Sequence, residues 1–203
     1  MLEIKLLNSS HPFHANSYLI SCDGESAIID PTASFDNSLI DGELKYILLT
    51  HGHFDHILEL DSWVDNTDAI AVISEDEKTL IANPDLNCYR MYNGSDKGFY
   101  KEVFTVKDGV QLGLGSKTIN VISTPGHTAG SVIYGIDNIA FVGDTVFSGG
   151  GYGRYDLPTG NSLMLKQSIE KIMKLNDNII MYPGHGDPTT LKNYKNDFYR
   201  WGK

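Results

Sequence analysis

Three histidines and an aspartate crowd into residues 51–56, whose sequence is HGHFDH. An apolar run, YILLT, occupies residues 46–50 directly before them. In an extended segment, side chains two residues apart point to the same side, so we expect His51 and His53 to reach one metal ion together. Imidazole and carboxylate ligands suit zinc, and they also suit iron or manganese.

The rest of this cluster is expected to face a neighbouring position. If the chain turns into a helix that starts near Ile57, Asp55 and His56 lie a few ångströms from the first pair. The four side chains then supply two half-sites for metal and not one complete site. An alternative interpretation makes Asp55 a helix cap and the histidines surface residues of a loop. That alternative suits a lone histidine better than this cluster.

Three further segments place a polar side chain just past a predicted strand. Each segment alone is a weak signal, because turn glycines and loop aspartates are common. We expect these loops to converge on one edge of the sheets, where sites are commonly built on a rigid scaffold. The segments are STPGHTAGSVIY at 123–134 with His127, FVGDTVFSGG at 141–150 with Asp144, and MYPGHGDPTT at 181–190 with His185.

Short apolar runs separated by turn residues must position these loops. Strands dominate each half of the chain and helices punctuate them, which predicts two sheets packed face to face with helices outside. Asp23 and Gly24 mark a hairpin turn, and Asn161 is a capping-type residue at the start of an amphipathic helix. The predicted strands are 17–21, 26–30, 46–50, 69–73, 110–115, 118–124, 131–136, 138–143 and 178–183, and the predicted helices are 57–64, 75–81, 161–175 and one from about Pro188.

The composition is that of an ordinary globular protein, with 203 residues of which 41% are hydrophobic, and we expect one domain over residues 1–203. The net charge of −10 disfavours binding to nucleic acid or to anionic membranes. Cys22 and Cys88 lie far apart and fit no CxxC motif, which favours a reducing compartment. The first 20 residues show no signal peptide or membrane span. We therefore expect a cytoplasmic protein.

Taken together and in this order, the motifs resemble those of metallo-β-lactamase fold hydrolases, most closely the glyoxalase II-like branch, the hydroxyacylglutathione hydrolases. The similarity runs from about residue 16 to about residue 190. It implies an α/β protein with a four-layer αββα sandwich and two divalent metal ions, with zinc as the first candidate. It implies that His51, His53 and His127 hold one ion, that Asp55, His56 and His185 hold the second, and that Asp144 bridges the two.

The chemistry that this resemblance implies is hydrolysis by a metal-bridging hydroxide. Two cations about 3.5–4 Å apart lower the pKa of a shared water from about 15.7 toward neutrality, and one of them stabilises the charge that develops on a carbonyl oxygen. Asp55 is the candidate catalytic residue that orients the nucleophile. We expect a small-molecule thioester as substrate, of S-acylglutathione type or another small thioester. A thiolate whose conjugate acid has a pKa of about 8.5 leaves without a strong general acid.

Other functions of the same fold remain open alternatives. A persulfide dioxygenase uses a single iron to activate oxygen, and a lactonase opens an ester ring. A non-catalytic metal-binding module would retain all these ligands without turnover. A nuclease is disfavoured by the net charge of −10. The oligomeric state is not predictable from the sequence.

The glycine-rich segment SGGGYGRYDLPTGN, residues 148–161, holds the candidate substrate residues Tyr152 and Arg154. It resembles the GRTDLPGG-type segment of the glyoxalase II-like branch, with Tyr155 in place of threonine. We expect Arg154 to pair with Asp156 and brace the loop. Direct contact with a substrate carboxylate is the second alternative.

Four features depart from that branch or match none of its motifs. The carboxy-terminal helical domain that binds glutathione in full-length glyoxalase II is not expected here, because the chain ends soon after residue 190. Ile57 and the three residues after it, LEL, stand where the branch often has glycine. The aromatic segment 88–100 walls a substrate cleft, forms a dimer contact or packs in the core. His11 and His14 are expected to be structural or surface residues.

Overall fold

The amino-terminal half of the chain forms a six-stranded sheet in the computed structural model, which describes residues 1–93, 95 and 97–201. The first three strands are antiparallel, and the remaining strands run parallel to the third. The strands lie in chain order: β1 (Glu3–Leu7), β2 (Ser17–Cys22), β3 (Glu25–Ile29), β4 (Glu43–Leu48), β5 (Ile70–Ser74) and β6 (Phe104–Val106).

A second six-stranded sheet comes from the carboxy-terminal half of the described chain. Its neighbours are antiparallel except for one parallel pair, β13 with β10. Across the sheet the order is β14 (Thr189–Thr190), β13 (Ile180–Pro183), β10 (Ile139–Gly143), β9 (Val132–Ile136), β8 (Lys117–Ser123) and β7 (Gln111–Leu114). A short ribbon of β11 (Val146–Phe147) and β12 (Gly151–Tyr152) follows β10.

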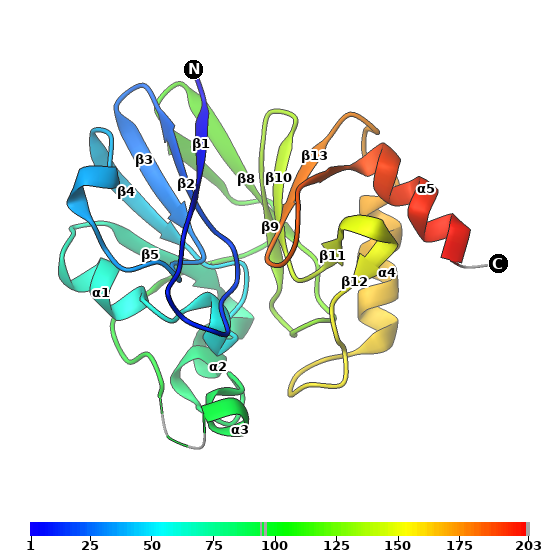
Figure 1. Cartoon of the computed structure of the whole chain (residues 1–203), viewed down its shortest axis with the longest axis horizontal. Helices are drawn as coiled ribbons and strands as arrows, with labels where there is room; N and C mark the ends of the chain where they lie inside the picture. Colours follow the sequence, from blue (N-terminus) through cyan, green and yellow to red (C-terminus); the bar gives the residue numbers. More distant parts are fainter. Residues whose placement is uncertain (94, 96, 202–203) are drawn as a thin grey trace.

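Helices flank the two sheets (Figure 1). α1 (Leu60–Asp65), α2 (Lys78–Ala82) and α3 (Tyr89–Asn93) lie on the side of the first sheet, and α4 (Ser162–Ile172) and α5 (Leu191–Trp201) lie on the side of the second. Short 3-10 helices span Asn37–Leu39, Phe54–His56, Glu75–Glu77 and Ser148–Gly150. Within the described part of the chain, no helix has both the length and the apolar character needed to cross a membrane.

Three buried clusters hold these layers together. Tyr18 and Leu48 of the first sheet pack against Tyr134 and Phe141 of the second, so the central cluster lies between the sheets. A second cluster joins the first sheet to Trp63 of α1. A third joins the second sheet to α4 and α5 through side chains that include Leu165, Val142 and Tyr194. This arrangement confirms the predicted four-layer αββα sandwich.

Local sequence signals account for several elements. Asp23 and Gly24 have positive φ angles of 51° and 82°, which a two-residue hairpin turn between β2 and β3 requires. The side chain of Asn161 accepts a hydrogen bond from Met164 N at 3.0 Å and so caps α4. Both predictions from the sequence are confirmed.

Other element boundaries were wrong. The predicted helix from Ile57 begins three residues later, at Leu60, and Asp55 and His56 instead lie in the 3-10 helix before it. Ile57 leaves helical geometry, with φ −121° and ψ 19°, because its side chain packs in the cluster beneath the first sheet. The last helix begins at Leu191, because the two residues before it pair with β13. The sequence did not predict the helix α3 or the strands β1, β6, β11, β12 and β14.

Candidate metal centre

The structure brings all seven predicted ligands together at one end of the two sheets. Each side chain lies in a loop that follows a strand: β4 for the 51–56 cluster, β8 for His127, β10 for Asp144 and β13 for His185. The ligand atoms fall into overlapping groups in which every pair of atoms is within 4.8 Å. The groups are His51, His53 and His127; His51, His56 and Asp144; and Asp55, His56 and His185.

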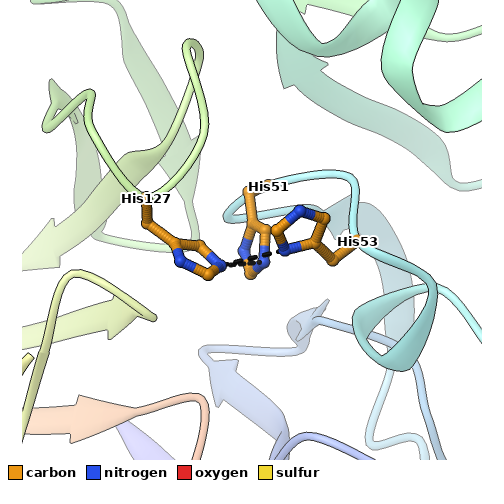
Figure 2. Close-up of side chains that lie close together, drawn as sticks. All are labelled: His51, His53 and His127. Carbon is orange, nitrogen blue, oxygen red and sulfur yellow. Dashed lines mark hydrogen bonds between the residues drawn. The ribbon is translucent and has the colours of Figure 1, made fainter. Parts of the chain in front are cut away.

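His51, His53 and His127 form the three-histidine group, whose ring nitrogens point toward one another (Figure 2). His53 Nδ1 lies 2.9 Å from His127 Nε2, which lies 3.2 Å from His51 Nε2. All three side chains are buried. Burial lowers the pKa of each imidazole, and that of His53 falls to about 3. These rings are therefore neutral and carry the lone pairs that a metal ion needs.

The tautomers of His51 and His127 follow from their second hydrogen bonds. The Thr50 hydroxyl donates to Asp30 Oδ2 at 2.7 Å, so His51 Nδ1 donates to that hydroxyl at 3.2 Å. His127 Nδ1 donates to the carbonyl oxygen of Arg154 at 2.7 Å. In both rings Nε2 is thus left unprotonated and faces the group, as metal-binding histidines require.

Asp55, His56 and His185 form the Asp55 group, which differs in charge and in exposure. His185 Nε2 lies 3.2 Å from Asp55 Oδ2. Burial lowers the pKa of His56 and of His185, but nearby carboxylates outweigh burial and raise both values. Burial raises the pKa of Asp55, yet the hydrogen bond to His185 and the charge of His56 bring it below its ordinary value. This group therefore holds paired opposite charges.

Asp144 lies between the two groups. Its Oδ1 is 3.3 Å from His56 Nε2, and its Oδ2 is 3.6 Å from His185 Nε2 and 3.7 Å from His127 Nε2. Burial favours the neutral acid, but the surrounding histidines hold the pKa of Asp144 well below its usual range. Its carboxylate thus faces both groups.

Unpartnered buried atoms show that the site fits metal ions. Among the described residues, His53 Nε2, His56 Nε2 and Asp144 Oδ1 are buried and make no hydrogen bond, although the last two lie 3.3 Å from each other. Buried polar atoms are rarely left in this condition, because removing them from water without a partner is costly. Imidazole nitrogens and carboxylate oxygens converging in this way are a donor set for zinc, iron or manganese.

Asp30 supports this donor set and was missed in the sequence. It follows β3, and its carboxylate accepts hydrogen bonds from His56 Nδ1 at 2.8 Å, Thr50 N at 2.8 Å and Thr50 Oγ1 at 2.7 Å. Asp30 therefore orients His56 directly and His51 through Thr50. The sequence did carry a signal for Asp30. This residue stands at the end of a strand-type run, SAIID, and Asp144 likewise follows a strand-type run.

Gly184, which directly precedes the ligand His185, lies close against two other ligands. A Cβ atom at position 184 would collide with Asp144 Oδ1 and with the ring of His56. The backbone of Gly184 is also fixed, since its N–H donates to the carbonyl of Gly143 at 2.8 Å. Glycine is needed here so that the strand end approaches the ligands closely.

A cleft of about 330 Å³ opens over the ligands. It is lined by ligand side chains and by a largely aromatic wall, which consists of Phe13, Phe54, Cys88, Tyr92, Phe147, Tyr152, Arg154 and Leu157. A larger groove of about 740 Å³ lies between α4 and α5, but none of the seven ligands lines it. We take the smaller cleft as the reaction site because it contains the donor set.

The glycine-rich segment and the aromatic segment 88–100 both contribute to this cleft. Arg154 pairs with Asp156 through two hydrogen bonds of 2.9 and 2.8 Å, which confirms the predicted brace. Its Nη1 also donates to the Tyr92 hydroxyl at 3.3 Å, while Tyr152 borders the cleft. In the aromatic segment Phe99 is buried in the core and Tyr100 is exposed. Two of its positions, 94 and 96, lie outside the described residues.

The two remaining histidines lie outside the ligand groups. His11 Nε2 is 2.7 Å from a carboxylate oxygen of Glu59, which ties the loop after β1 to the start of α1. His14 Nδ1 lies 3.1 Å from the carbonyl of Ala15. The structural role predicted for His11 is confirmed.

Comparison with known proteins identifies relatives of this chain. The chain is 33% identical over 190 residues to a probable metallo-hydrolase, YqgX, of Bacillus subtilis, with 89% of each chain covered. It is 32% identical over 197 residues to hydroxyacylglutathione hydrolase GloC of Haemophilus influenzae, covering 88% of this chain and 89% of that protein.

Two crystal structures share the fold. BLEG-1 B3 metallo-beta-lactamase has a TM-score of 0.85 and 29% identity, with 96% of this chain and 97% of that chain covered. TTHA1623 in a di-iron-bound form has a TM-score of 0.82 and 28% identity, with 94% and 96% covered. The profile of the metallo-beta-lactamase superfamily matches residues 11–185, which include every ligand of the site. The chain therefore belongs to the metallo-beta-lactamase superfamily, as one of its metal-dependent hydrolases.

Proposed function

We propose that this protein hydrolyses small thioesters, of S-acylglutathione type or with another thiol carrier, by means of two divalent metal ions, with zinc as the first candidate. One observation carries the proposal. The carboxylate of Asp144 lies 3.7 Å from His127 of the three-histidine group and 3.6 Å from His185 of the Asp55 group. A carboxylate shared in this way supports a pair of ions over a single one.

Each group of side chains would contribute a distinct function. Metal ions bound there would supply a water of lowered pKa and polarise a substrate carbonyl. His51, His53 and His127 would hold one ion, Asp55, His56 and His185 the other, and Asp144 would be shared. Asp55 is negatively charged, since its pKa lies below the ordinary value, so its carboxylate can accept a hydrogen bond from the attacking water and orient it.

The protonation states favour a thioester over an amide or a β-lactam. An amine leaving group needs a proton, whereas a thiolate with a conjugate-acid pKa of about 8.5 leaves as the anion. Asp55 and Asp144 both have lowered pKa values, and the ring nitrogens of His56 and His185 would be taken up by the metal ion, so none of these groups would offer a proton at the reacting centre. The identity to a hydroxyacylglutathione hydrolase, 32% over most of both chains, supports the same choice.

The cleft supports a small acyl group. Its volume of about 330 Å³ must hold the scissile carbonyl and the groups on either side of it. Phe13, Phe54 and Tyr92 would contact the apolar part of the substrate, while Tyr152 borders the same cleft. The guanidinium of Arg154 is already neutralised by Asp156, so we propose that Arg154 shapes the wall.

Metal analysis of the purified protein, combined with turnover of S-lactoylglutathione, tests the proposal. We expect two divalent ions per chain and metal-dependent loss of the thioester absorbance. One iron per chain, with oxygen consumption on a persulfide and no thioester cleavage, would contradict it. Hydrolysis of a lactone or a β-lactam without hydrolysis of any thioester would contradict it equally.

A cytoplasmic location is part of the same proposal. Cys22 and Cys88 are both buried free thiols, a state that a reducing compartment preserves. We expect cell fractionation to recover the protein with cytosolic markers. Recovery with membranes or in the medium would contradict this location.

A further inference from the structure

Glu77 is a fully buried carboxylate that none of the steps above uses. It is the last residue of the 3-10 helix Glu75–Glu77, which directly follows β5, and its side chain is 0% exposed. It belongs to none of the metal-ligand groups. A buried carboxylate is costly unless its oxygens are satisfied, so its partners identify its role.

Its partners are the backbones of two ligand-bearing loops. Oε2 accepts a hydrogen bond from Gly52 N at 2.8 Å, and Oε1 accepts one from Gly130 N at 2.7 Å. Gly52 lies between the ligands His51 and His53, and Gly130 lies three residues after the ligand His127. One carboxylate thus joins the two loops that supply the three-histidine group. These loops are more than 70 residues apart in the sequence.

Both glycines are needed for this contact. A Cβ atom at position 52 would lie 2.6 Å from Ile81 Cγ2 and 2.7 Å from Leu80 Cδ2 of α2. A Cβ atom at position 130 would lie 2.7 Å from Glu77 Cγ. Side chains here would hold the loops away from the carboxylate, so the glycines let both backbones close over it.

We propose that Glu77 is a positioning residue that fixes the His51–His53 loop against the His127 loop and so preorganises the three-histidine group for its metal ion. The inference concerns metal binding, and it holds whichever ester the protein cleaves. Without this carboxylate, two buried N–H groups lose their acceptor and the loops lose their direct link. The three ring nitrogens then converge less accurately, and affinity for the ion falls.

The test compares Glu77→Gln with Glu75→Gln in the same short helix. Glutamine keeps the size of Glu77, but its NH₂ group faces an N–H and cannot accept from it. Glu75 is exposed and pairs with Lys107, so its substitution is a matched control. Metal-free proteins are titrated with Zn²⁺ against a chromophoric chelator. We expect one of two sites in Glu77→Gln to weaken about 10–100-fold, while the other site and the Glu75→Gln variant match the wild type.

A double-mutant cycle assigns the weakened site. In a His53→Ala background the three-histidine group is already broken, so adding Glu77→Gln is expected to leave the remaining site unchanged. Wild-type affinity at both sites of Glu77→Gln would overturn the proposal. Equal weakening of both sites would also overturn it, because that pattern indicates a general loss of stability.

Hydrogen exchange on the metal-free wild type keeps the proposal testable if Glu77→Gln does not fold. The amides of Gly52 and Gly130 are expected to be strongly protected, since each donates to a buried carboxylate. Exchange of either amide at the rate of a free loop would overturn the proposal.

Discussion

The three-histidine group and the Asp55 group use different physical means to prepare for a cation. The first consists of neutral imidazoles, since burial lowers the pKa of His51, His53 and His127. The second balances carboxylates against histidines whose pKa values the carboxylates raise. In the first group all the side chains are buried, whereas in the second the side chain of His185 is 42% exposed.

This difference indicates that the two groups have different roles, one in binding a metal ion and the other in admitting the substrate. The three-histidine group is buried without a charge, so the electrostatic cost of burying it before an ion binds is small. Its geometry is set by the hydrogen bonds of Glu77 and by those of the ring nitrogens. Side chains of both groups line the cleft, but only the Asp55 group has a strongly exposed member, His185, so we expect a small substrate to reach the centre on that side. The predictions below test this contrast, beginning with the largest expected effect.

Removal of the metal ions is expected to abolish activity in two stages. The ion of the Asp55 group should leave first, because His185 is 42% exposed to solvent and chelator, while the residues of the three-histidine group are at most 3% exposed. The protein should remain folded, since the cluster between the sheets contains no ligand. Metal content and activity are measured together during dialysis against a chelator, with circular dichroism as the control for folding. Simultaneous loss of both ions would contradict the difference in accessibility.

Asp144→Ala is expected to remove the side chain that both groups share. We expect loss of at least one ion, and loss of several kcal/mol of transition-state stabilisation, which corresponds to a fall on the order of 10³-fold in kcat/KM. Metal analysis and thioester turnover are measured beside Asp68→Ala, which alters an exposed aspartate outside the ligand groups. Two tightly held ions and the wild-type rate in Asp144→Ala would show that this carboxylate does not bridge.

Asp30→Asn is expected to weaken both groups, unlike a change at Glu77. Asp30 accepts from His56 in one group and, through Thr50, supports His51 in the other. An amide in its place cannot accept all three hydrogen bonds, so we expect a loss of about 10–100-fold in metal affinity. The same chelator competition measures each site. Weakening of one site alone would mean that the link through Thr50 carries no energy.

All seven side chains of the donor set were predicted from the sequence, but the residues that orient them were not. Each ligand is the polar residue of a short segment with turn glycines next to a strand, so spacing along the chain was enough to find it. Asp30 and Glu77 are single carboxylates in ordinary surroundings. Their partners are brought to them only by sheet packing, across 26 residues to His56 and 53 residues to Gly130. No local sequence pattern predicts contacts between residues so far apart along the chain.

The continuation after His56 shows the same limit. A glycine was expected after the ligand cluster, but Ile57 packs beneath the first sheet and Leu58 packs with Phe54 and Cys88. Glu59 holds His11. The fold class was predictable because alternating strands and turns leave few ways to bury two sheets. The helix boundary was not, because these tertiary contacts override the helical spacing of the segment.

Tyr92→Ala is expected to give the smallest effect, on substrate binding and not on metal. The Tyr92 ring lies 5.4 Å from that of Phe54 and 6.4 Å from that of Phe13, measured between centroids, and forms one wall of the cleft. Aromatic contacts of this kind contribute about 0.5–1.5 kcal/mol, so KM should rise about 2- to 10-fold while kcat changes less. Steady-state kinetics of Tyr92→Ala are compared with those of Tyr100→Ala, which alters an exposed ring of the same segment. Because Tyr92 belongs to none of the ligand groups, both variants should retain the metal content of the wild type. A fall in kcat with unchanged KM, or loss of an ion, would contradict this prediction. It would show that Tyr92 supports the metal centre and not only substrate binding.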